Sequence, residues 1–539
     1  MSRLHALGYS AYCFAAATAA VLLLIGVRLP LAHADEATAP QPKVAPAPTA
    51  ADVPAEGCAP GSESQGFFKR LSDSYKAHLF PADAPPPDPD APPSGYDPSR
   101  VSPPPESMPP WPYSTWPEGG TQAIGYENMY YGPLMDAIWC GRNGKKLKDS
   151  RWTLYGWIQP GGNISTSQTH FNKVTGTGGN YPAAYSYQPN TVQLDQVAFY
   201  LERTPDEVQK DHFDWGFRFT GLYGTDYKYT FSDGILSYQY TREERLYGFD
   251  PVMYYIDLYF PKVLDGMNVR IGRYISIPDI EAQLAPNNVT YSHSLLYTYD
   301  PYTQNGIVTT IRINRNWSVQ GEISGGNDVA PFLAHENHLT PAACVIWQSN
   351  SGNDLIYPCM NGLNDSNWRW NNIQHAVAAW YHKFNDQWHT DTEVWYMWQA
   401  HTPNVNNEQG ASIISATFPA PQFNIGAPSG AQCNPAVVYC YSYSWAILNY
   451  VNYQYTPRDI FTWRSDFLDD AKGQRTGFKT RYAEFTLGYT HWVGDAFEMR
   501  PELRFEHAFN VDAYDNPTAT PGQGKHSQLT LAADMIFHY

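Results

Sequence analysis

The sequence predicts an all-β protein, a transmembrane antiparallel up-and-down β-barrel that follows a proline-rich arm. Three features of the chain support this class. From Trp152 onward, segments of about ten residues alternate apolar and polar side chains, as barrel strands do with one face to lipid and one to the lumen. The connections between these segments alternate in length, and the chain ends inside such a segment, on Tyr539.

The N-terminus has the pattern of a secretory signal peptide. Arg3 precedes an apolar stretch from Phe14 to Val27, and Ala32-His33-Ala34 supplies the small residues of a cleavage site. The apolar stretch is shorter than the roughly 20 residues that a membrane-spanning helix needs. We therefore expect residues 1–34 to be removed on export, and the mature chain to reach the Gram-negative outer membrane.

A proline-rich stretch follows the signal. Of the 44 prolines in the chain, 21 lie between Pro40 and Pro117. Such a composition cannot bury a core, so residues 35–120 are predicted to be a periplasmic arm, mostly disordered. Within the arm, Phe67 to Leu79 has apolar residues at helical spacing, and it is either a short docking helix or an unstructured stretch. Residues 121–151 are predicted to be a short connecting segment, and 152–539 the barrel.

The alternating segments number about 14, with a range of roughly 12 to 16, and bacterial barrels have even strand counts. The predicted strands lie near residues 152–166, 191–203, 213–223, 252–260, 267–275, 306–313, 317–325, 371–384, 388–399, 443–455, 460–467, 479–493, 497–507 and 527–539.

Short and long connections take turns along the barrel segment. Outer-membrane barrels have short periplasmic turns and long extracellular loops, so the short set is expected to face the periplasm, as do both termini. The short connections are 261–266, 314–316, 385–387, 456–459 and 494–496, and the long ones include 225–251, 276–305, 326–370 and 400–442.

Six cysteines remain after the signal, and in an oxidising compartment an even number suggests disulfides. Cys344 with Cys359 and Cys433 with Cys440 are close in sequence, and each pair falls within a long connection. We predict that each pair restrains one extracellular loop, which leaves Cys58 with Cys140.

Charged residues in the alternating segments are expected to face the lumen. Arg or Lys facing hydrocarbon at mid-depth would cost about 2 to 4 kcal/mol, so Met499, Leu503 and Phe505 face lipid and the charges between them face inward. The same alternation gives the predicted pore-lining set: Arg218, Arg270, Arg312, Asp391, Glu393, Glu498, Arg500, Glu502, Arg504 and Glu506. These side chains line a pore or, in a closed interior, satisfy one another.

The last strand has an apolar face that includes Leu529, Leu531 and Met535 and ends on Phe537 and Tyr539. This pattern resembles the C-terminal signal by which outer-membrane proteins are recognised during assembly. We therefore predict Phe537 and Tyr539 as an assembly signal and the barrel-assembly machinery as a partner.

Several segments resemble the OmpL-like β-barrel porin family of Gram-negative outer membranes. They are the runs from Trp215 to Tyr227, Asn268 to Tyr274 and Tyr291 to Leu296, followed by Gln304-Asn305-Gly306-Ile307. In order they look like that family's strand with a GTDY loop, its GR strand and its SxSL loop. The resemblance covers Trp152 to Tyr539 and implies a porin in the outer membrane.

The function predicted from these features is a porin-like channel for passive diffusion of small polar solutes or ions. The alternatives are a binding or anchoring barrel without an open pore and an outer-membrane lipid hydrolase. Expected partners are outer-membrane lipid, lipopolysaccharide and small polar solutes, and a homo-oligomer is compatible with the sequence. The net charge of −17 makes nucleic acid an unsuitable partner.

We expect no enzyme activity, no cofactor and no metal. His335-Glu336-Asn337-His338 has one residue too few for a zinc-protease motif. In Tyr291-Ser292-His293-Ser294, neighbouring side chains of an extended loop point apart, whereas a nucleophile needs its base within hydrogen-bond reach. These residues are expected to pack within a loop.

Overall fold

The computed structural model describes residues 58, 62–81, 96–102, 124–127, 129–170, 179–183, 185–243, 245–275, 279–331, 337–369, 371–417, 430–515 and 524–539. The predicted signal peptide and most of the predicted arm lie outside these residues. In the described part of the chain, no helix is both long and apolar enough to cross a membrane.

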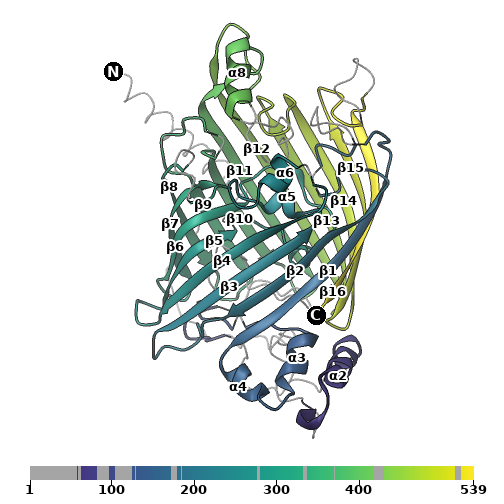
Figure 1. The fold of residues 1–539 in the computed structure, drawn as a ribbon. Coiled ribbons are helices and arrows are strands. Elements are labelled where there is room, and N and C mark those ends of the chain that lie inside the picture. Colours follow the sequence, from purple (N-terminus) through teal and green to yellow (C-terminus); the bar gives the residue numbers. More distant parts are fainter. Residues whose placement is uncertain are drawn as a thin grey trace, which may run out of the picture. The chain divides into compact units, whose positions relative to one another are not determined.

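Sixteen antiparallel strands form a closed up-and-down barrel, in which each strand pairs with its neighbours in sequence and β16 pairs with β1 (Figure 1). Closure pairs Trp157 with His538, and the backbone N–H of Tyr539 donates to the carbonyl of Gly156 at 2.9 Å. The strands are β1 (Trp152–Ser165), β2 (Val192–Arg203), β3 (Asp214–Gly224), β4 (Gly248–Phe260), β5 (Met267–Ile275), β6 (Thr303–Arg312), β7 (Trp317–Asn327), β8 (Thr340–Gln348), β9 (Asp354–Asn361), β10 (Gln374–Lys383), β11 (Trp388–Pro403), β12 (Tyr439–Thr456), β13 (Asp459–Asp470), β14 (Thr480–Val493), β15 (Phe497–Ala508) and β16 (Ser527–His538).

The count of about 14 strands is wrong, because the predicted loop 326–370 contains β8 and β9. Their inner faces carry Ala342, Ile346 and Leu355, which are buried, so both faces of this hairpin are apolar and the polar alternation is missing. Pro341 and Pro358 also argued against strands in the sequence.

Burial alternates residue by residue along the strands, as two-sided barrel strands require. In β15, Leu503 and Phe505 are 42 % and 41 % exposed on the outer face. Glu502 and Arg504, which alternate with them along the strand, are buried on the inner face. Apolar side chains therefore cover the outside of the barrel and polar side chains cover much of its inside.

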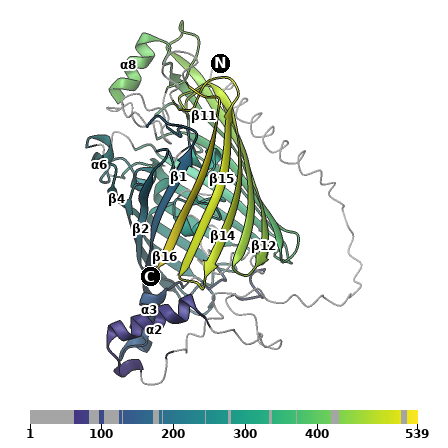
Figure 2. The same cartoon turned by 90° about the vertical axis from the view of Figure 1, so that its right-hand side faces the viewer.

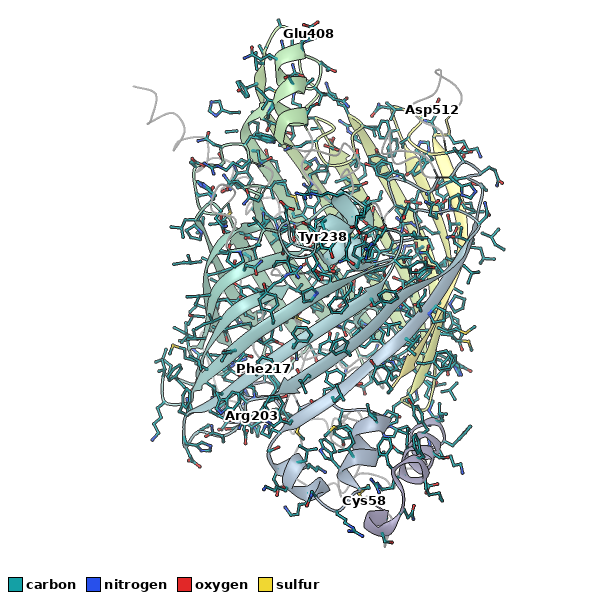
Figure 3. The ribbon with its side chains drawn as sticks, in the orientation of Figure 1. Cys58, Arg203, Phe217, Tyr238, Glu408 and Asp512 are labelled. Carbon is teal, nitrogen blue, oxygen red and sulfur yellow. A yellow bond between two sulfur atoms is a disulfide. The ribbon has the colours of Figure 1, made fainter. Side chains whose placement is uncertain are left out.

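The short connections lie at the end of the barrel that carries the C-terminus, and the long ones lie at the opposite end (Figures 1 and 2). Arg203 and Phe217 lie in the half toward the short turns, and Glu408 and Asp512 lie at the far end (Figure 3). The long connections carry α5 (Tyr227–Thr230), α6 (Tyr238–Thr241), the 3-10 helix η3 (Ala285–Asn287), α7 (Leu295–Thr298) and α8 (Glu408–Thr417).

Beyond the short turns lie the 3-10 helix η2 (Ser62–Ser64) and the helices α2 (Phe67–Leu79), α3 (Pro133–Trp139) and α4 (Gly144–Asp149) (Figure 2). Helix α2 confirms the prediction of a short docking helix from Phe67 to Leu79. The buried ring of His78 in α2 bonds Asp136 of α3 and Asp495 in the β14–β15 turn, each at 2.7 Å. Burial lowers the pKa of His78, but these two carboxylates outweigh it and raise the pKa to about 9.

A second piece of the predicted arm, residues 96–102, packs against the short turns. Arg100 is 1 % exposed, and its guanidinium donates to the carbonyls of Val208 at 2.9 Å and Asp265 at 3.0 Å. The first carbonyl belongs to the β2–β3 turn and the second to the β4–β5 turn. Part of the arm is therefore bound to the barrel.

Three disulfides join Cys58 to Cys140, Cys344 to Cys359 and Cys433 to Cys440. The expectation that Cys344–Cys359 restrains a loop is wrong, because these residues are directly opposed partners on β8 and β9, with their side chains on the inner face. The segment pairs as a hairpin, which brings the two Cα atoms within 4.2 Å.

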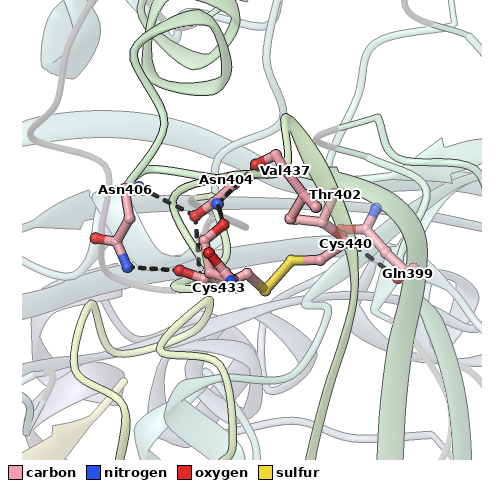
Figure 4. The surroundings of a disulfide bond; sticks show 8 residues. Gln399, Thr402, Asn404, Asn406, Cys433, Val437 and Cys440 are labelled. Carbon is pink, nitrogen blue, oxygen red and sulfur yellow. Dashed lines mark hydrogen bonds between the residues drawn. A yellow bond between two sulfur atoms is a disulfide. The ribbon is translucent and has the colours of Figure 1, made fainter.

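The Cys433–Cys440 disulfide does lie at the base of the β11–β12 connection, where Cys440 is the second residue of β12 (Figure 4). Asn404 organises the same turn: its side-chain oxygen accepts from the N–H of Cys433 at 3.0 Å, and its amide donates to the carbonyl of Val437 at 2.8 Å. The disulfide and this asparagine together fix the base of the loop that carries α8.

Candidate functional site

The long connection between β5 and β6 folds into the barrel, and we call residues 279–302 the inserted loop. Its residues Leu295, Leu296 and Tyr297 have no exposed surface, and its polar groups bond strands on the far side of the barrel. The N–H of Ile280 donates to Glu393 of β11 at 2.8 Å, and the carbonyl of Gln283 accepts from Gln196 of β2 at 2.7 Å. The loop therefore crosses the lumen.

Helix α7 gives the inserted loop an apolar contact with the barrel wall. Leu295 and Leu296 pack in one buried cluster with Leu355 of β9 and Trp395 of β11. The indole N–H of Trp395 also donates to the carbonyl of Leu296 at 3.2 Å. The same cluster contains the buried apolar side chains of β8 and β9, so this contact explains why their inner faces are apolar and why the sequence pattern did not predict these two strands.

Arg464 of β13 binds the middle of the inserted loop. Its guanidinium donates to the hydroxyls of Thr290 at 2.9 Å and Ser292 at 2.8 Å, and pairs with Glu484 of β14 at 3.0 Å and Glu281 of the loop at 3.4 Å. The side chain has no exposed surface. Its Nη groups donate to the loop and its Nε donates to Glu484 of β14, so this guanidinium joins the loop to the wall.

Two of the predicted pore-lining arginines hold the same loop. Arg500 donates to the carbonyls of Ala285 at 2.6 Å and Asn288 at 2.7 Å, and Arg504 donates to the carbonyl of His293 at 2.6 Å. Both side chains are 1 % exposed. They lie on the inner face, but they are covered by backbone.

The predicted acids of the same region are also inward and buried. Glu502 accepts from the N–H of Ser292 at 3.1 Å, and Glu506 pairs with Arg504 at 2.8 Å. Glu498 is 1 % exposed near the short-turn end of β15. We call the inner faces of β13 to β16 the covered wall, because the inserted loop lies over them.

Two more of the predicted arginines occupy what we call the arginine wall, the inner faces of β3 to β5. Arg218 pairs with Glu202 at 2.6 Å, and Arg270 bonds Asp257 through two donors at 2.8 and 3.0 Å. Both guanidinium groups lie near the ring of Tyr255, at 5.6 and 3.8 Å from its centroid. The Arg218 side chain is 21 % exposed, far more than the arginines of the covered wall.

Three predicted residues lie away from both walls. Glu393 of β11 accepts from the N–H of Ile280 in the inserted loop at 2.8 Å, and the other two lie at the short-turn end of the barrel. Arg312, at the short-turn end of β6, lies 5.9 Å from the ring centroid of Tyr126. Asp391, at the same end of β11, accepts from the amide of Asn452 at 3.1 Å. All three point inward and are buried, so all ten predicted residues share the inner face, but they do not form one site.

The titratable side chains of the inserted loop have shifted pKa values. Burial, reinforced by the positive charges of Arg464, Arg500 and Arg504 and opposed by a hydrogen bond to the Ala282 carbonyl, lowers the pKa of His293 to about 3, so the ring is neutral. Burial raises the pKa of Asp279 to about 7 and that of Asp300 well above its usual value. These shifts follow from the removal of the loop from water.

The Ser–His sequence of this loop does not form a nucleophile–base pair. The Ser292 hydroxyl accepts from Arg464, the Ser294 hydroxyl donates to Glu281 at 2.8 Å, and a ring nitrogen of His293 faces the Ala282 carbonyl at 2.8 Å. Each group is used for packing inside the loop, as the sequence predicts. The other candidate motif lies partly outside the described residues, since His335 and Glu336 are not among them.

Arg464, Glu484 and Glu281 join the inserted loop to the covered wall, but none of them was predicted as a site residue from the sequence. For Arg464 the signal was present, because Phe461 and Trp463 alternate with it along a predicted strand and would have placed it inward. Glu281 carried no signal, since an extended loop gives no periodicity that reports its direction.

Comparison with known proteins gives one family and a set of distant folds. Residues 151–539 match the family described as "Putative beta-barrel porin-2, OmpL-like". No curated protein matches the chain.

Three solved structures share low similarity with the chain. An anion-selective porin from Comamonas acidovorans is 10 % identical, with 72 % of this chain and 99 % of that chain covered and a TM-score of 0.43. The outer-membrane channel DcaP of Acinetobacter baumannii is 8 % identical, covering 72 % and 97 %, with a TM-score of 0.44. OmpT of Vibrio cholerae is 7 % identical, covering 72 % and 97 %, with a TM-score of 0.39. At these values the likenesses carry no argument about solutes.

Proposed function

This chain belongs to the OmpL-like porin-2 family, and we propose that it forms an outer-membrane channel for the passive diffusion of small polar solutes or ions. The observation that carries the proposal is the inserted loop, which crosses the lumen and is bonded to the far wall by Arg464, Arg500 and Arg504. A loop fixed in this way narrows a barrel without being part of its wall. A barrel that served only as a pedestal would need no such device.

The arginine wall is the proposed route for solutes. Arg218 keeps 21 % of its side chain exposed, and Glu202 and Asp257 offer carboxylates beside it and beside Arg270. A route lined by both signs of charge suits small polar solutes, and the residues nearest the permeating ion decide its preference, because more distant charges are screened within about 8 to 10 Å.

Conductance of the purified, refolded chain in planar lipid bilayers tests the proposal. Discrete current steps are expected from heat-modifiable, folded barrel. Silence from the same folded material would reject the channel and leave the anchoring barrel as the better reading.

One observation favours that second reading. The β11–β12 connection carries α8, and the Cys433–Cys440 disulfide restrains the base of this loop. A long loop with a restrained base is suited to binding a partner. Deleting residues 406–417 distinguishes the two functions. A channel keeps its current steps after the deletion. A binding barrel shows no current steps before or after the deletion, and the deletion abolishes its binding to its partner cell surface or polymer.

A further inference from the structure

Three carboxylates that the channel proposal does not use converge inside the barrel. Asp279 and Asp300 come from the two ends of the inserted loop and Glu393 from β11, and one oxygen of each lies within 4.8 Å of the others. Asp300 and Glu393 have no exposed surface. Glu393 lies more than 90 residues along the chain from both aspartates, and the folding of the loop brings the three together.

Among the described residues, most of the oxygens in this cluster have no hydrogen-bond partner outside it. In the described part of the chain, no donor group other than a carboxyl of the cluster itself faces Asp279 Oδ1, either oxygen of Asp300 or Glu393 Oε1, all of which are buried. The remaining Glu393 oxygen accepts from the N–H of Ile280 at 2.8 Å, so the inserted loop holds this carboxylate in place beside Asp279 and Asp300. Burying carboxylates without partners is costly, so a positively charged group is expected among them.

Within the described residues, one cation acts on the three carboxylates. Arg475 lies close enough to Asp300 to act on it electrostatically, and its guanidinium donates to the neighbouring carbonyl of Tyr299 at 2.8 Å. One guanidinium against three carboxylates leaves an excess of negative charge at this place.

We propose that Asp279, Asp300 and Glu393 bind one divalent cation of the Ca²⁺ type, which ties both ends of the inserted loop to β11. Ca²⁺ takes six to eight oxygen ligands at about 2.3 to 2.6 Å, so oxygens that share it lie up to about 5 Å apart, as these do. Three carboxylates supply three to six of those ligands. The site is independent of whether the barrel conducts.

The test is Ca²⁺ binding by the full chain, folded in detergent and freed of metal with a chelator. Equilibrium dialysis against Ca²⁺ is expected to give one saturable site per chain. The double variant Asp300→Asn with Glu393→Gln should weaken that site by at least about tenfold, because it removes two of the three negative charges of the ligand set. Glu322→Gln is the matched control: Glu322 is also a buried inner-wall acid, on β7, and its loss should leave binding unchanged.

A second measurement needs no variant. Trp395 lies two residues from Glu393 on the same face of β11, so Tb³⁺ in the site should emit when the indole is excited, and Ca²⁺ should quench that emission by displacement. Absence of saturable Ca²⁺ binding and of Trp-sensitised emission in the folded wild type would overturn the proposal and favour a proton shared between Asp279 and Asp300. Equal binding by the double variant and the wild type would also overturn it.

Discussion

The covered wall and the arginine wall are built by the same alternation of strand residues, yet their arginines do different things. The guanidinium groups of Arg500 and Arg504 donate hydrogen bonds to carbonyls of the inserted loop, and both side chains are 1 % exposed. Arg218 pairs with a carboxylate of the adjacent strand and stays 21 % exposed. An inward position therefore does not make a residue part of a pore lining; what covers its face decides this.

The largest effect is expected from breaking the covered wall at Arg464. Arg464→Met leaves Glu281 and Glu484 buried without their cation, and such a loss typically costs about 3 to 5 kcal/mol. Urea unfolding in lipid vesicles measures the free energy, and the single-channel conductance should rise because the inserted loop loses its central anchor.

The control for this variant is Arg481→Gln. Arg481 pairs with Asp469 on the outer face and its side chain is 62 % exposed, so its loss should cost less than about 1 kcal/mol. Equal destabilisation by both variants would show that Arg464 does not anchor the loop.

The turn between β14 and β15, two strands of the covered wall, is bonded to His78 of α2 through Asp495. The strength of this contact should depend on pH. The carboxylates of Asp136 and Asp495 raise the pKa of His78 from 6.5 to about 9 against the opposing effect of burial. Because the folded-state pKa is raised, the added stability, up to about 3 kcal/mol, is complete below pH 6.5 and is lost as the pH rises through about 9. Among the described residues, Tyr131 is a further titratable group that these two aspartates act on.

Hydrogen-exchange protection of α2 between pH 6 and pH 10 measures this local stability. Protection is expected to fall across that interval in the wild type and to stay flat in His78→Gln. A wild-type profile without pH dependence would contradict the raised pKa.

A smaller effect, on access, compares the two walls directly. The six described cysteines are paired in disulfides, so an engineered cysteine adds a free thiol to this part of the chain. A charged methanethiosulfonate reagent should label Arg218→Cys in the folded barrel and reduce its current. Ala532→Cys, on the inner face of β16 and 3 % exposed, should stay unlabelled. Faster labelling at position 532 would reverse our assignment of the walls.

The smallest effect concerns ion preference. Arg218→Gln removes one positive charge from the proposed route, so the reversal potential in a salt gradient should shift modestly toward cations, most clearly at low salt. Lys145→Gln, an exposed residue of α4 outside the barrel, should leave the potential unchanged. An unaltered potential for Arg218→Gln would place the route elsewhere.

The sequence by itself determined the features that depend on local periodicity. A period of two places one face in lipid and the other inside, so the inward direction of Arg218, Arg270, Arg500 and Arg504 followed from their neighbours in each strand. The helical spacing from Phe67 to Leu79 allowed α2 as one of two alternatives, and the short separation of Cys433 and Cys440 indicated their disulfide.

Only the tertiary structure decided what covers each face. β8 and β9 lacked alternation because their inner faces pack against Leu295 and Leu296 of a loop from another part of the chain. The meeting of Asp279, Asp300 and Glu393 and the burial of Arg500 and Arg504 have the same origin. These contacts join residues far apart in sequence, and their energy comes from burial and pairing across the lumen, which no local pattern of residues records.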